Sequence, residues 1–171
     1  MANGHAANPI LKDIESAESL QFGDALGAVL LDLAKRVVVD GEGATKFIEI
    51  EISGAPDVES AKKVAFTIAH SPLVKTAFFG EDANWGRIVA AAGRAGVLFD
   101  PEKVDLFFDG ICVFKAGTPV GGKAIEEKAS RAFHQREIQV RLDLGIGDSN
   151  FTAYTCDLSY DYVKINASYR S

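Results

Sequence analysis

The 171-residue sequence has little cysteine, no long apolar run and no N-terminal export signal. Cys112 and Cys156 are far apart and form no C-x-x-C pair, which argues against zinc and thioredoxin-type chemistry. We expect two buried, reduced thiols, with a disulfide possible only if their strands are neighbours. No apolar stretch approaches the ~20 residues that span a bilayer, and the first residues lack the basic and apolar regions of a signal peptide. We therefore predict a cytoplasmic protein with no membrane partner.

The chain also lacks excess positive charge. Eighteen Lys and Arg residues stand against 24 Asp and Glu residues, giving a net charge of −6, and the two signs are interspersed. A net-acidic surface argues against non-specific nucleic-acid binding. Apolar residues make up 47% and charged residues 25%, which excludes disordered, collagen-like and coiled-coil classes. The length fits one domain, or two small interlocked ones, without a disulfide or metal staple.

Familiar catalytic signatures are missing as well. His5, His70 and His134 are isolated from one another, so a metal site is not predicted. No G-x-S-x-G motif is present, and no residue shows a nucleophile paired with a base. On its own residues, the chain therefore carries no predicted catalytic centre.

Hydrophobic periodicity predicts a mixture of helices and strands. Steps of three and four indicate helices over 16–38, from Pro56–Asp57 to Ser71–Pro72, over 85–94 and over 123–134. Strands are predicted over 45–53, 73–79, 104–108, 111–114, 137–144 and 150–158. Asp109–Gly110 predicts a type I′ hairpin, and Gly145–Asp148 predicts a turn that joins 137–144 to a partner strand. The fold class is α+β, with mixed sheets and β-hairpins covered by helices.

Two short motifs concentrate polar residues. Gly41–Lys46 (GEGATK) presents Glu42 on a loop, and residue types alone favour a helix end with a solvated glutamate. It is not a phosphate loop, because the P-loop spacing is absent. Gly80–Arg87 (GEDANWGR) reads either as a capped helix start with an internal ion pair or as a helix N-terminus that attracts a carboxylate. Residue types do not decide between these two interpretations.

Four stretches, in this order, resemble the C-terminal part of the ornithine acetyltransferase (glutamate N-acetyltransferase) family of arginine biosynthesis. They are Val39–Phe47, Ser71–Ala77, Gly80–Arg87 and Thr155–Ser171. The resemblance covers essentially the whole chain. It implies the family's layered sandwich, with residues 1–70 as the remainder of the active-site domain and 71–171 as a C-terminal α/β domain.

The resemblance also implies a reaction. Family members cleave themselves before a threonine, which becomes the N-terminal nucleophile of the second chain, the beta-chain. That threonine carries an acetyl group from N-acetylornithine to glutamate by a ping-pong route, with an oxyanion hole in the first chain, the alpha-chain. No metal or organic cofactor is needed.

Matching the family's motifs residue by residue assigns three substrate contacts to this chain. Glu42 is the acidic contact, suited to a substrate ammonium group, and Asn166 and Ser171 suit a substrate carboxylate. The family more often has an Asp where this chain has Ser168, and an aromatic residue where it has Arg94. Structural or supporting roles are expected for Asp82, Asn84, Trp85 and Arg87.

The family's nucleophilic threonine has no match here. It belongs a few dozen residues upstream of the segment that Ala2–Gly4 resembles. We therefore expect this chain to be most of a beta-chain and to be inactive alone. Its partners would be the alpha-chain of the same precursor and the N-terminal beta segment, in a hetero-oligomer of processed chains. The alternative is a non-catalytic ligand-binding or scaffold module that keeps the family fold.

Overall fold

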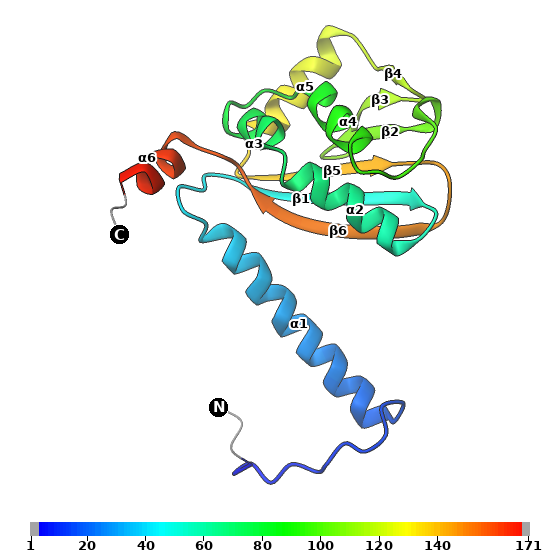
Figure 1. Ribbon diagram of the computed structural model, residues 1–171, viewed down its shortest axis with the longest axis vertical. Helices are drawn as coiled ribbons and strands as arrows, with labels where there is room; N and C mark the ends of the chain where they lie inside the picture. The colour runs from blue at the N-terminus through cyan, green and yellow to red at the C-terminus, as the bar shows by residue number, and fades with distance from the viewer. Residues whose placement is uncertain (1–3, 169–171) are drawn as a thin grey trace. The chain divides into compact units, whose positions relative to one another are not determined.

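The computed structural model describes residues 4–168 (Figure 1), and its contacts divide the chain into two compact units, Met1–Val37 and Val38–Ser171. Most of the first unit is the helix α1 (Ala17–Val39), which confirms the helix predicted over 16–38. Although α1 carries many apolar side chains, none of its residues is buried. No helix within residues 4–168 has both the length and the apolar character needed to cross a membrane.

The second unit is built on a six-stranded sheet of order β4-β3-β2-β5-β1-β6. Its strands are β1 (Phe47–Ala55), β2 (Asp105–Phe108), β3 (Ile111–Lys115), β4 (Thr118–Pro119), β5 (Glu137–Asp143) and β6 (Ser149–Cys156). β1 and β5 run parallel, whereas the other neighbours run antiparallel. The mixed sheet with its helices confirms the predicted α+β class.

Helices cover one face of this sheet, as Figure 1 shows for α2 and α4. They are α2 (Val58–Ala69), α3 (Pro72–Phe79), α4 (Trp85–Gly93) and α5 (Lys123–Phe133). Alternate residues of β1 point into the core, so Ile48, Ile50 and Ile52 are fully buried. The Phe133 ring of α5 lies 5.2 Å from that of Phe78 and 4.8 Å from that of Phe108, which ties α5 to α3 and β2.

The strand predicted over 73–79 is wrong, because this segment is the helix α3. Pro72 occupies the first helical turn, where its missing N–H is not needed. Val74, Ala77 and Phe78 are the buried residues, at the spacing of three and four that marks one helix face. The run is too short for its periodicity to separate helix from strand by sequence alone.

The partnership predicted between 137–144 and 150–158 is also wrong. β6 pairs with β1, which lies between β5 and β6. The connection crosses the end of β1 instead of turning back on β5, since Ile146 N–H donates to the Gly54 carbonyl at 2.9 Å. A Cβ at Gly147 would lie 2.2 Å from the Ala55 carbonyl oxygen, so this crossing requires glycine.

Two other predictions have clear outcomes. Asp109 and Gly110 both have positive φ (46° and 77°), as a type I′ turn between β2 and β3 requires. Cys112 and Cys156 are free and only half-buried, and their strands β3 and β6 are not neighbours. The predicted domain boundary near residue 70 stays a prediction.

The remaining elements are the 3-10 helix η1 (Pro101–Lys103) and the helix α6 (Tyr160–Ser168). α6 follows β6 after a three-residue connection, and Tyr160 packs edge-on against Phe79 of α3 at 5.3 Å between ring centroids. Within residues 38–168, the start of α6 also lies beside the loop that leads into β1, since Ser159 Oγ donates to the Gly43 carbonyl at 2.6 Å, and the candidate site lies there.

Candidate functional site

The GEGATK loop and helix α6 bring together two of the three predicted substrate residues. Glu42 lies exposed on the loop, and its Oε2 accepts a hydrogen bond from Asn166 Nδ2 at 2.9 Å. These residues are 124 positions apart in the sequence. The third predicted residue, Ser171, lies outside the described residues.

The orientation of the Asn166 amide follows from its partners. Asn166 Nδ2 also donates to the Tyr162 carbonyl at 2.9 Å, so both amide N–H groups are engaged. The opposite orientation would turn Oδ1 toward two acceptors, which is repulsive. In this geometry Asn166 offers only its Oδ1 acceptor to a ligand, beside the Glu42 carboxylate. In this geometry the pair suits a cationic group, whereas the predicted donation from Asn166 to a substrate carboxylate would require Asn166 to give up one of these two hydrogen bonds.

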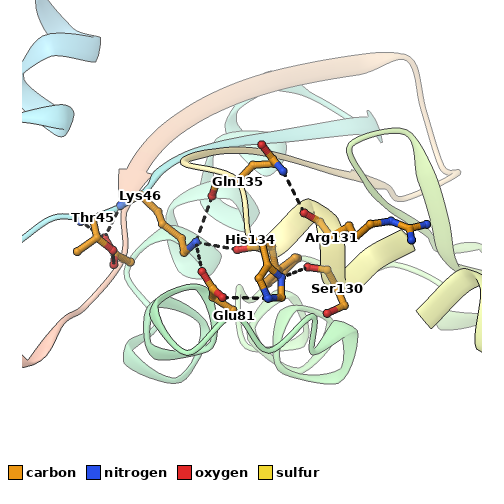
Figure 2. Close-up of polar contacts among 9 residues, drawn as sticks. Thr45, Lys46, Glu81, Ser130, Arg131, His134 and Gln135 are labelled. Atoms are coloured by element: carbon orange, nitrogen blue, oxygen red, sulfur yellow. Dashed lines mark hydrogen bonds and ion pairs between the residues drawn. The ribbon is translucent and has the colours of Figure 1, made fainter. Parts of the chain in front are cut away.

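Lys46, at the end of the same loop, is a buried cation with a full set of partners (Figure 2). Its ammonium group donates to Glu81 Oε1 at 2.9 Å, to the Phe133 carbonyl at 2.7 Å and to the Gln135 carbonyl at 3.1 Å. Since an ammonium group has three N–H donors, none is left for a ligand. Lys46 thus joins the GEGATK loop to the end of α5 and to the GEDANWGR motif.

Glu81 continues this chain of contacts to His134. Its Oε2 lies 3.2 Å from His134 Nε2, and His134 Nδ1 lies 2.7 Å from the Ser130 carbonyl oxygen (Figure 2). The hydrogen bond from Lys46 lowers the pKa of Glu81 below its ordinary value of 4.5, and the charges of Lys46 and His134 act in the same direction. Glu81 is held with a positive φ of 56°, unusual for a residue with a side chain.

The rest of the GEDANWGR motif forms a capped helix start. Asn84 Oδ1 accepts from the Arg87 N–H at 3.2 Å, and the Arg87 guanidinium lies 3.7 Å from Asp82. Arg87 also donates to the Leu73 carbonyl at 2.9 Å, which ties α4 to α3. Trp85 stacks on Phe114 at 5.0 Å. Within residues 4–168, no hydrogen bond or ion pair joins these four predicted supporting residues to Glu42 or Asn166.

Two buried residues at the site were not singled out by the sequence analysis. Asp157 and Ser159 are 3% and 4% exposed, and both hydrogen-bond to the GEGATK loop. They lie in the Thr155–Ser171 stretch that carries the resemblance, but residue type alone does not distinguish a buried Asp from a solvated one. The available signal was an Asp and a Ser just before a helix, a typical capping pattern.

The described residues contain no group of three or more His, Cys, Asp or Glu side chains placed to hold a metal ion. The expectation that no cofactor is needed stays a prediction.

The whole chain, residues 1–171, matches the family model described as the ArgJ family. It is 50% identical over 171 residues to the arginine biosynthesis bifunctional protein ArgJ of Geobacter sulfurreducens, and 52% identical over 172 residues to that of Desulfotalea psychrophila. Each match covers all of this chain but 43% of the relative, so the chain spans less than half the length of these relatives. The crystal structure of the Bacillus halodurans ArgJ protein matches with a TM-score of 0.91 and 42% identity, over 99% of this chain and 78% of the other.

Proposed function

The chain belongs to the ArgJ family, and on that basis we propose that it forms part of an acyltransferase of arginine biosynthesis. The reaction is acetyl transfer from N-acetylornithine to glutamate through an N-terminal threonine nucleophile. We infer that this nucleophile lies outside the 171 residues, and that the chain alone is inactive. The complete enzyme is then a protein that contains this chain and spans the full length of such relatives.

In this proposal the chain supplies part of the substrate site. The supporting observation is the pairing of Glu42 with Asn166 at 2.9 Å, with both amide donors of Asn166 engaged. What faces a ligand is then a carboxylate and a carbonyl oxygen, which bind an ammonium group by charge-assisted hydrogen bonds. N-acetylornithine keeps a side-chain ammonium group, so we assign this pair to it. Ser171 stays a proposed substrate contact.

The proposed partners are the alpha-chain and the N-terminal beta segment, in a hetero-oligomer of processed chains. The apolar surface of α1 supports this, since Leu26, Leu30 and Leu33 are each more than two-fifths exposed in the described residues. A continuous apolar helix face is normally covered by another chain or segment. A cytoplasmic location stays a prediction from the sequence.

The test is Glu42→Gln in the complete enzyme. Removing the negative charge should raise the KM for N-acetylornithine about tenfold or more, because a hydrogen bond to a charged group contributes about 1.5–3 kcal/mol. The kcat should change little, since the lost contact is present in both ground and transition states. Steady-state kinetics measure both constants.

The matched control is Glu59→Gln, which removes an exposed glutamate of α2 that pairs only loosely with Lys62, at 3.9 Å. Its KM should equal that of the wild type. The isolated 171-residue chain, assayed in parallel, should show no turnover. An unchanged KM in Glu42→Gln contradicts the proposed substrate site, and turnover by the isolated chain contradicts the proposed location of the nucleophile.

A further inference from the structure

A buried carboxylate holds the second half of the GEGATK loop. Asp157 Oδ1 accepts from the backbone N–H groups of Thr45 at 2.8 Å and Lys46 at 3.0 Å, while Oδ2 accepts from Thr45 Oγ1 at 2.5 Å. Hydrogen bonds to a charged acceptor are about twice as strong as neutral ones. Asp157 therefore fixes the path of the loop immediately after Glu42 and Gly43.

A buried hydroxyl holds the first half of the loop. Ser159 Oγ donates to the Gly43 carbonyl at 2.6 Å and accepts from the Tyr162 N–H at 3.3 Å. The second bond caps the first turn of α6, the helix that carries Asn166. One side chain thus bonds both to the residue that follows Glu42 and to the helix that presents Asn166.

Gly43 allows the loop and the helix to approach this closely. Its φ is +67°, and a Cβ there would lie 2.6 Å from the Tyr162 nitrogen and 2.8 Å from Ser159 Oγ. Backbone atoms of α6 cannot move away without moving the helix itself, so a larger residue at position 43 would displace Asn166 from Glu42.

We propose that Asp157 and Ser159 are positioning residues for the substrate site: they clamp the GEGATK loop to the start of α6 and so hold Glu42 and Asn166 at hydrogen-bond distance. The proposal rests on the proposed function of that pair. Neither residue needs to touch the substrate. Their effect is to hold the GEGATK loop and α6 so that Glu42 and Asn166, which are 124 residues apart, stay hydrogen-bonded to each other. The Glu42 carboxylate and Asn166 Oδ1 are then the acceptors left for a ligand.

The experiment is Ser159→Ala in the complete enzyme, with KM for N-acetylornithine, kcat and the unfolding temperature measured on the same preparations. We expect KM to rise about tenfold, the size of one strong hydrogen bond, with kcat within about a factor of two. Ser159→Thr, which keeps the hydroxyl, should restore most of the wild-type KM. Gly43→Ala, which disturbs the same contact from the other side, should also raise KM.

Ser60→Ala is the matched control. Ser60 Oγ makes a hydrogen bond at the start of another helix, α2, where it donates to Asp57 Oδ2 at 3.0 Å. It should lower the unfolding temperature without changing KM. If Ser159 acted only through general stability, Ser60→Ala and Ser159→Ala would change the unfolding temperature and KM in the same way. If Ser159 positions the site, only Ser159→Ala raises KM.

The outcomes separate this proposal from the proposed function. A wild-type KM in a folded Ser159→Ala enzyme, with a raised KM in Glu42→Gln, overturns the positioning role and leaves the substrate site standing. A wild-type KM in both variants overturns the substrate site itself. If Ser159→Ala does not fold, Asp157→Asn, which keeps the side-chain volume, takes its place with the same expected and contradicting results.

Discussion

At the residue scale, the ion pair between Lys46 and Glu81 makes stability depend on pH. The pKa of Glu81 is lowered in the fold, chiefly by the hydrogen bond from Lys46. A lowered folded pKa means that the ionised carboxylate stabilises the fold. This contribution is fully present above the ordinary pKa of 4.5 and is lost as pH falls through the lower folded value.

We therefore predict that Glu81→Gln lowers the free energy of unfolding of the chain at pH 7, and that the difference from the wild type shrinks as pH is taken below 4.5. Denaturant unfolding at a series of pH values measures this difference. Glu137→Gln, on the exposed end of β5, is the control and should track the wild type. A difference that stays constant from pH 7 to pH 3 would show that Glu81 does not stabilise the fold through its charge.

Single residues of the site were predictable to different degrees. Glu42 and Asn166 came from the resemblance, and they meet in the fold. The donor direction of Asn166 was not predictable, because it depends on the Tyr162 carbonyl one helical turn away. The partners of Lys46 were not predictable either, because only the fold brings the Phe133 and Gln135 carbonyl oxygens, at the end of α5, to its ammonium group.

At the element scale, α5 packs against its neighbours through a buried aromatic side chain. Phe133 is 1% exposed and its ring contacts those of Phe78 and Phe108. We predict that Phe133→Ala lowers the free energy of unfolding by about 3–5 kcal/mol, as expected when a buried aromatic ring leaves a cavity. Leu98→Ala, at a residue that is 96% exposed, should change it by less than about 0.5 kcal/mol. Chemical denaturation measures both, and equal effects would contradict this packing.

Long, periodic elements were predictable and short or non-local features were not. The apolar stripe of α1 and the alternation in β1 each extend over enough residues to identify their period. The eight residues of α3 do not. The order of the strands is a third case, because the insertion of β1 between β5 and β6 joins segments some 90 residues apart, and no local pattern encodes it.

At the scale of the whole molecule, the α+β class followed from the mixture of hairpins and helices, and the family followed from four motifs in order. The division of contacts at Val37 and Val38 was not foreseen, because the periodicity of α1 runs through it without a break. The proposed reaction belongs to a protein more than twice as long as this chain. We propose that these residues contribute a substrate site to it, in which the hydrogen bonds made by Asp157, Ser159 and Lys46 hold the GEGATK loop in place.

The central claim is that Glu42 and Asn166 bind the side-chain ammonium group of the acetyl donor. The most direct test compares kcat/KM for N-acetylornithine and for N-acetylnorvaline, which has the same carbon chain without that ammonium group, in the wild-type complete enzyme and in Glu42→Gln. We predict that Glu42→Gln lowers kcat/KM for N-acetylornithine about tenfold or more and leaves N-acetylnorvaline unchanged, so that the preference collapses. An equal loss for both substrates, or an undiminished preference in the variant, would contradict the claim.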